Sequence, residues 1–193
     1  MWVFGYGSLM WDGWQRDRQH RCWNNIPECT CTRRQQADLL GYRRTFNKAS
    51  IVNWGSDAAR APTLNLERFE SGRCGGIAFE FPDRSREDVL RYLRCREGRG
   101  FSFPEVSVSL GQDGVVDTVV PIYHGPLIID DATLERLTSM VIAARGKSGS
   151  CIKYVRGIAQ ELEGLGIADS AVTDLWKNVQ DRCKAKGIDP LTA

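Results

Sequence analysis

The sequence contains no apolar run long enough to cross a membrane. Every candidate helix carries charged residues, and the apolar runs fall short of the roughly 20 residues that a bilayer-spanning helix needs. The chain also lacks blocks of like charge, because 26 Lys and Arg balance 24 Asp and Glu, for a net charge of +2. A near-neutral chain has little general attraction for phosphates or anionic lipids. We therefore expect no membrane partner and no nucleic-acid partner.

Residues 1–7 lack the features of a secretion signal. They contain no basic segment, and glycines interrupt the apolar stretch that a signal peptide needs. An odd set of cysteines without an export signal predicts reduced thiols in a cytoplasmic protein. The seven cysteines are Cys22, Cys29, Cys31, Cys74, Cys95, Cys151 and Cys183.

The cysteines also lack the paired C-x-x-C spacings that are typical of structural zinc. Cys22, Cys29 and Cys31 lie near His20 in the sequence, but their spacing does not favour a metal site. Cys95 lies in a predicted helix, where cysteine is more often a small buried apolar side chain than a nucleophile. We therefore expect no metal ligands.

The first two thirds of the chain is rich in strand-forming residues separated by turns. Gly75 and Gly76 lie inside one predicted strand and indicate a bulge or a close backbone approach. The last two predicted strands form a hairpin around a turn at residues 111–114. Strands are predicted, from aromatic and β-branched content, at residues 1–5, 37–46, 62–69, 73–81, 103–110 and 115–124.

Helical periodicity is present in four segments. The first begins at Ser85, which is predicted as a helix cap, and ends before Gly98. The other three, at residues 131–145, 150–165 and 169–186, carry apolar residues at three- and four-residue spacing. Strands first and helices last predict an α+β fold. No repeat or linker divides the chain, so we expect one domain over residues 1–193.

Residues 4–11 (FGYGSLMW) do not follow a strand or helix period. Their glycines allow backbone N–H groups to converge on an anion, and the hydroxyls of Tyr6 and Ser8 add hydrogen-bonding groups. The segment lacks both the Walker pattern and the dinucleotide-binding pattern, so nucleotide binding is not predicted. We treat it as a candidate anion-binding loop.

Glu97 is the last residue of the predicted helix that ends before Gly98. The partial negative charge of that helix end disfavours a further negative charge, which favours a carboxyl group that accepts and returns a proton. A solvated glutamate paired with Arg94, Arg96 or Arg99 fits the same spacing.

Several segments, in order, resemble the ChaC-like γ-glutamylcyclotransferases, and the resemblance covers most of the chain. They are FGYGSL-x-W at residues 4–11, GYRRTF at 41–46, GIAF at 76–79, YLRCRE at 92–97 and SG at 148–149 followed by Tyr154. The resemblance implies a small mixed β-barrel of about six or seven strands with surrounding helices and a helical C-terminal third.

The resemblance also implies a substrate and a site. The substrate is a small γ-glutamyl compound, glutathione in this branch, cleaved without a cofactor to 5-oxoproline and cysteinylglycine. Glu97 is then the catalytic general base and acid, because the α-amino group of the substrate must lose a proton before it attacks its own γ-carbonyl. The implied substrate-binding residues are Phe4, Gly5, Tyr6, Gly7, Ser8, Leu9 and Tyr154.

Three alternatives remain open. Residues 47–63 depart from the Arg-Gly-Thr type of segment of glutathione-specific members, and Phe101 stands where a tyrosine is usual, so γ-glutamyl amino acids or amines are alternative substrates. A non-catalytic binding module of the same fold uses Glu97 only structurally. An acyl-transfer enzyme uses Ser8 or Cys95 as the nucleophile. The long segment at residues 15–32 is interpreted as a lid or a surface insertion.

Overall fold

The computed structural model describes residues 1–16, 20–24 and 30–192. The chain folds into two compact units, and each is described here by itself. The first consists of Met1–Arg43 and Arg68–Pro126, and the second of Arg44–Glu67 and Leu127–Ala193.

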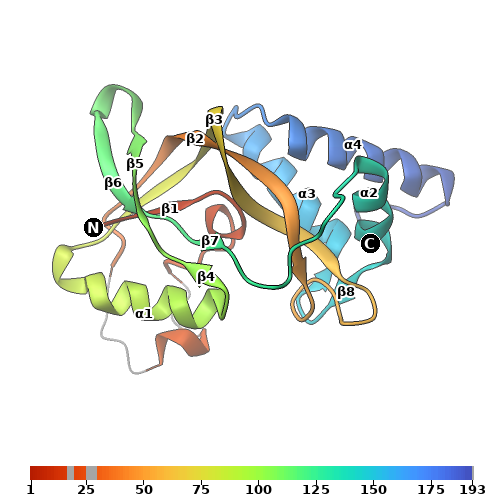
Figure 1. The fold of residues 1–193 in the computed structure, drawn as a ribbon, viewed down its shortest axis with the longest axis horizontal. Coiled ribbons are helices and arrows are strands. Elements are labelled where there is room, and N and C mark those ends of the chain that lie inside the picture. The colour runs from red at the N-terminus through yellow and green to blue at the C-terminus, as the bar shows by residue number, and fades with distance from the viewer. Residues whose placement is uncertain (17–19, 25–29, 193) are drawn as a thin grey trace. The chain divides into compact units, whose positions relative to one another are not determined.

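A closed β-barrel organises the fold (Figure 1). Strand β1 pairs antiparallel with β3 and parallel with β6, so the barrel is mixed, as the resemblance implied. The described residues contribute five strands to it rather than the expected six or seven. In barrel order they are β1 (Trp2–Gly5), β3 (Ala61–Glu80), β2 (Arg33–Ser50), β5 (Glu105–Ser109) and β6 (Val115–Val119).

The smaller strand number arises because two predicted strands form one. The predicted strands at residues 62–69 and 73–81 fall, apart from Phe81, within the single 20-residue strand β3, which pairs with the 18-residue strand β2. Strand β6 ends before Pro121, which has no N–H to donate to a sheet. The chain beyond it forms β7 (Ile122–Tyr123), which pairs with β4 (Phe101–Ser102) outside the barrel.

An aromatic cluster packs helix α1 (Arg86–Glu97) against the first unit's core. The Trp14 ring stacks on Tyr92 with ring centroids 5.5 Å apart, and Trp23 stacks on Tyr92 at 4.0 Å. Trp14 also meets Phe79 of β3 edge-on at 5.4 Å. Because Trp14 and Tyr92 are buried, these contacts fix the position of the C-terminal half of α1 relative to the N-terminal segment.

The helices of the second unit lie within their predicted segments, and each begins after a residue that caps it. The side chains of Thr133, Ser150 and Asp169 each accept a hydrogen bond from the backbone N–H three residues later. The helices are α2 (Leu134–Ala143), α3 (Cys151–Gly164) and α4 (Ser170–Ala185), with a short hairpin, β8 (Arg145–Gly146) and β9 (Gly149–Ser150), between α2 and α3. Within the described residues, no helix has the length and apolar character to span a membrane.

A buried ion pair lies within the second unit. The Arg44 side chain is fully buried, and its Nη1 donates to Asp169 Oδ2 at 2.7 Å. Asp169 also caps α4 through its other carboxylate oxygen, which accepts from the N–H of Val172. The carboxylate therefore joins the strand that carries Arg44 to the start of α4.

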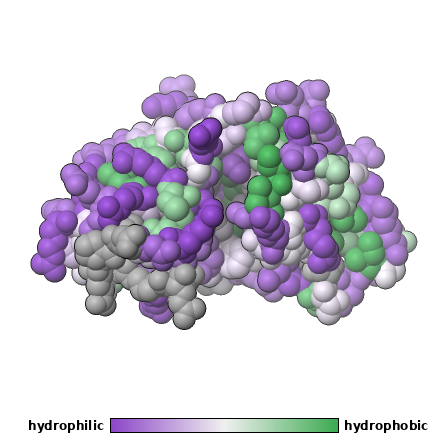
Figure 2. All heavy atoms as spheres, turned by 90° about the horizontal axis from the view of Figure 1, so that it is seen from below, coloured by the Kyte–Doolittle hydropathy of each residue, from purple (hydrophilic) through white to green (hydrophobic). Residues whose placement is uncertain are grey.

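Exposed large apolar side chains are scattered over the described sequence. They include Leu40, Val115 and Leu191. On the face shown in Figure 2, hydrophilic residues predominate and apolar atoms form separate patches, so this face is largely polar.

Candidate active site

The glycine loop begins where β1 ends against β3. Gly5 pairs with Ile77, and a Cβ atom on the adjacent Gly76 would lie 2.4 Å from the Gly5 carbonyl oxygen and 2.7 Å from the Phe4 ring. A Cβ on Gly5 would lie 2.9 Å from Leu9 Cβ. Both positions favour glycine, and at Gly76 this is the close backbone approach that the Gly75-Gly76 pair predicted.

A 3₁₀ turn, η1 (Ser8–Met10), follows the strand. The N–H of Met10 donates to the Gly7 carbonyl at 2.9 Å, and those of Trp11 and Asp12 donate to the Ser8 carbonyl. By the geometry of a helical turn, the first N–H groups, those of Ser8 and Leu9, have no acceptor within it. These two groups are therefore candidate backbone donors for an anion.

The side chains of the loop differ in their surroundings. Phe4 and Leu9 are buried in the core, and the buried Tyr6 hydroxyl donates to the Pro121 carbonyl at 2.7 Å. Ser8 is only partly buried. Phe4, Tyr6 and Leu9 therefore support the loop, and Ser8 is its accessible polar side chain.

Helix α1 ends at Glu97, as predicted. Gly98 has a positive φ of 79°, which glycine adopts without strain, and its N–H donates to the Arg94 carbonyl at 3.1 Å. Ser85 occupies the cap position at the other end, but its side chain makes no capping hydrogen bond. The local sequence thus determines where the Glu97 carboxylate leaves the helix.

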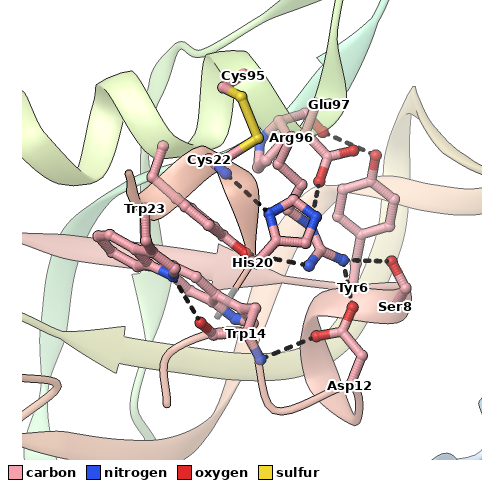
Figure 3. Close-up of polar contacts among 12 residues, drawn as sticks. Tyr6, Ser8, Asp12, Trp14, His20, Cys22, Trp23, Cys95, Arg96 and Glu97 are labelled. Atoms are coloured by element: carbon pink, nitrogen blue, oxygen red, sulfur yellow. Dashed lines mark hydrogen bonds and ion pairs between the residues drawn. A yellow bond between two sulfur atoms is a disulfide. The ribbon is translucent and has the colours of Figure 1, made fainter. Parts of the chain in front are cut away.

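The Arg96 guanidinium joins Glu97 to the glycine loop (Figure 3). Its Nε donates to Glu97 Oε1 at 3.0 Å. Its Nη2 donates to Ser8 Oγ at 3.1 Å and to the Asp12 carboxylate. Its Nη1 donates to the Tyr92 hydroxyl at 3.4 Å. Loop and carboxylate, which lie far apart in the sequence, therefore meet at one cation.

The ion pair at Glu97 is not a solvated surface pair. Only 16% of the Arg96 side chain and 18% of the Glu97 side chain are exposed. Burial alone lowers the pKa of the Arg96 guanidinium, but the carboxylates of Glu97 and Asp12 and the Tyr92 hydroxyl outweigh burial and raise that pKa above its ordinary value. Arg96 is therefore a permanent cation shared between two carboxylates.

Sequence reasoning did not find Asp12. Its Oδ2 accepts from Arg96, and its Oδ1 accepts from the N–H of Trp14 at 3.1 Å. The second bond, from an Asp side chain to a backbone N–H two residues later, is typical of Asp in turns. The Asp12-Gly13 pair is the sequence signal for that turn, but nothing local indicates the contact with Arg96.

Cys22 and Cys95 form a disulfide, with Cα atoms 5.6 Å apart. The expectation of reduced thiols is therefore wrong for this pair, and Cys95 is exposed rather than a buried apolar residue. The physical reason is the aromatic stack: Trp23, next to Cys22, packs on Tyr92, one turn before Cys95. A disulfide sulfur is not a thiolate, which removes Cys95 as the acyl-transfer nucleophile.

The remaining cysteines give no metal site within the described residues. No group of three or more His, Cys, Asp or Glu side chains there is arranged to hold a metal ion. Cys29, one of the three cysteines near His20 in the sequence, lies outside the described residues. Parts of the segment at residues 15–32, interpreted as a lid or a surface insertion, also lie outside them. The described cysteines outside the disulfide are Cys31, Cys74, Cys151 and Cys183.

Tyr154 belongs to the second unit. Its hydroxyl accepts from the N–H of Leu64 at 3.1 Å, and its ring lies 5.3 Å from that of Trp54. Only 4% of the residue is exposed. These contacts hold α3 against β3 within that unit.

Comparison with known proteins identifies the family. The family model for ChaC-like proteins matches residues 1–182, so the chain belongs to the ChaC-like family. The resemblance that the motifs indicated is thereby confirmed.

Several relatives and solved structures are similar over nearly the whole chain. The chain is 28% identical to the glutathione-specific gamma-glutamylcyclotransferase of Escherichia coli K12, over 93% of this chain and 73% of that protein. It is 28% identical to gamma-glutamylcyclotransferase 2-3 of Arabidopsis thaliana, over 93% and 88% of the two chains. A crystal structure of a yeast γ-glutamyl cyclotransferase specific to glutathione superposes with a TM-score of 0.77, at 20% identity and over 94% and 98% of the chains. The last similarity establishes the shared fold.

Proposed function

We infer that this chain is a γ-glutamylcyclotransferase that acts on glutathione and releases 5-oxoproline and cysteinylglycine. Membership of the ChaC-like family and relatives named for this activity support the inference. The structural observation that carries it is the Glu97 carboxylate, largely shielded and held beside the glycine loop.

In the proposed reaction, Glu97 takes a proton from the α-ammonium group of the glutamyl arm. The free amine attacks the γ-carbonyl carbon, so a C–N bond forms and closes a five-membered ring. The attacking nitrogen loses a second proton as the ring closes, the original amide C–N bond breaks, and Glu97 returns its proton to the departing nitrogen, so that cysteinylglycine leaves as an amine. One carboxyl group serves both proton transfers, and no water is consumed.

Intramolecular attack reduces what the protein must supply. Well-oriented intramolecular groups gain up to about 7–11 kcal/mol relative to separate reactants. The site therefore needs only to fold the glutamyl arm and to help protons pass from the attacking nitrogen to the departing nitrogen. The proposed reaction requires neither a cofactor nor a metal.

We assign substrate binding to the loop Phe4–Leu9. The N–H groups of Ser8 and Leu9 suit the α-carboxylate of the glutamyl arm or the oxyanion that forms at the γ-carbonyl. We also assign Tyr154 to substrate binding, by the family resemblance. We propose further that residues 1–193 act as one domain, since the family match spans both units.

The proposed partner is the small-molecule substrate alone, without nucleic acid. The proposed location is the cytoplasm. There, the exposed Cys95 side of the disulfide is open to exchange with small thiols.

Glu97→Gln tests the proposal, because it keeps the shape of the side chain and removes the base. The purified variant and the wild type are each incubated with glutathione, γ-glutamyl amino acids and γ-glutamyl amines, and 5-oxoproline is followed by mass spectrometry. We expect the variant to lose about 10²–10⁴-fold in turnover of glutathione, with a melting temperature that changes little because Asp12 still pairs with Arg96.

Glu87→Gln is the matched control, since Glu87 lies exposed in the first turn of the same helix. It should leave turnover unchanged. Wild-type turnover in Glu97→Gln would overturn the mechanism. If the wild type turns over γ-glutamyl amines or amino acids but not glutathione, the proposed substrate is wrong. If it binds these compounds without turnover, the protein is a binding module and not an enzyme.

A further inference from the structure

The contact between Arg96 and Glu97 is not one that a helix makes by default. Consecutive residues point about 100° apart around a helix, and side chains interact mainly at three- and four-residue spacing. Here the Arg96 guanidinium bends toward the helix end so that its Nε meets Glu97 Oε1. The bend requires anchors for the other nitrogens of the guanidinium.

Those anchors come from the N-terminal segment that follows β1, residues 8–14, and from α1 itself. Asp12 and Ser8 both accept from Nη2, and the buried Tyr92 accepts from Nη1. Asp12 is itself fixed, because its second oxygen holds the N–H of Trp14. The guanidinium therefore uses its three nitrogens to reach acceptors on both the N-terminal segment and α1, a geometry that its planar fork of five N–H donors suits and a single ammonium does not.

This arrangement leaves defined atoms for the substrate. Arg96 occupies Oε1 of Glu97, and Oε2 has no hydrogen-bond partner among the residues that the structure describes. Ser8 Oγ accepts from Arg96, which leaves the hydroxyl hydrogen of Ser8 available to donate to the substrate. One cation thus orients a proton acceptor and a hydrogen-bond donor of the same site.

We propose that Arg96, anchored by Asp12, is a positioning residue. It aims Oε2 of Glu97 at the α-amino group of the substrate, and it turns the Ser8 hydroxyl toward the substrate as a hydrogen-bond donor. This inference rests on the proposed function. Arg96 acts through Glu97 and Ser8, and Asp12 acts through Arg96.

Arg96→Lys separates geometry from charge, because lysine keeps the cation but loses the fork. We expect kcat for 5-oxoproline release to fall about 10²-fold, as misplacement of a reacting group by about 1 Å does, with KM within about threefold of the wild type. Arg94→Lys is the matched control, since Arg94 is exposed on the same helix, and it should not change kcat.

Asp12→Asn tests the anchor, and its expected effect is a fall of about tenfold in kcat with KM unchanged. If Asp12 acts through Arg96, this substitution costs nothing further in the Arg96→Lys background, so the two losses do not multiply. A purely structural role for Arg96 would instead lower the melting temperature of all these variants in proportion to the lost activity.

The inference is overturned if Arg96→Lys keeps kcat within about twofold of the wild type, if only KM changes, or if the two losses multiply in the double variant. Should Arg96→Lys not fold, Asp12→Asn decides alone: an unchanged kcat overturns the inference, and a tenfold loss at constant KM supports it. These outcomes are distinct from failure of the proposed function, which shows as a wild-type protein inactive on glutathione or as an active Glu97→Gln.

Discussion

Breaking the Cys22–Cys95 disulfide should cost the protein a large part of its stability. The two cysteines are 73 residues apart, and the loop-closure entropy for a loop of this length gives a stabilisation of about 4 kcal/mol. The bridge also ties η2 (Arg21–Trp23) to α1, next to the stack of Trp23 on Tyr92. Its loss therefore frees the unfolded chain and loosens the N-terminal segment that faces α1.

The assay compares urea unfolding of the oxidised protein with that of the double variant Cys22→Ser/Cys95→Ser. For a protein with an m-value of about 2 kcal/mol/M, a loss of about 4 kcal/mol lowers the unfolding midpoint by about 2 M. Cys31→Ser is the control, because Cys31 forms no disulfide and its substitution should leave the midpoint unchanged. Alkylation of the denatured protein before and after reduction independently counts the bridged cysteines. Equal midpoints for the oxidised protein and the double variant would refute the reasoning.

Two further substitutions test the packing of each unit by thermal unfolding. Gly76→Ala places a Cβ atom 2.4 Å from the Gly5 carbonyl oxygen, a backbone atom, so we expect a loss of stability of about 1–3 kcal/mol; an unchanged melting temperature would show that the strands do not approach so closely. Asp169→Asn keeps a side-chain acceptor at the start of α4 but removes the charge beside the buried Arg44, so we expect a loss of about 3 kcal/mol; a neutral result would mean that the Arg44 charge does not depend on this carboxylate.

Local sequence determined the helices and the position of Glu97. Helix boundaries depend on periodicity and capping, which involve residues a few positions apart, so α2, α3 and α4 lie within their predicted segments. The same holds for the end of α1, where Gly98 stops the helix directly after Glu97. The family resemblance, carried by short motifs in order, likewise needed no tertiary information.

Strand extent was less predictable, because a strand is completed by its partner. The turn-forming residues between 69 and 73 indicated a break, yet pairing with the long strand β2 continues β3 through them. The number of barrel strands was therefore overestimated.

The tertiary structure alone decided the partners of Arg96 and Cys95. Three arginines near Glu97 were equivalent in sequence, and only the approach of Asp12 and Ser8 to the end of α1 selects Arg96. Cys95 likewise finds Cys22 only because stacked aromatic rings bring the two segments together across 73 residues. The reason is the same in both cases: periodicity and capping act within a few residues, whereas side-chain pairing depends on which distant segments the packed core places side by side.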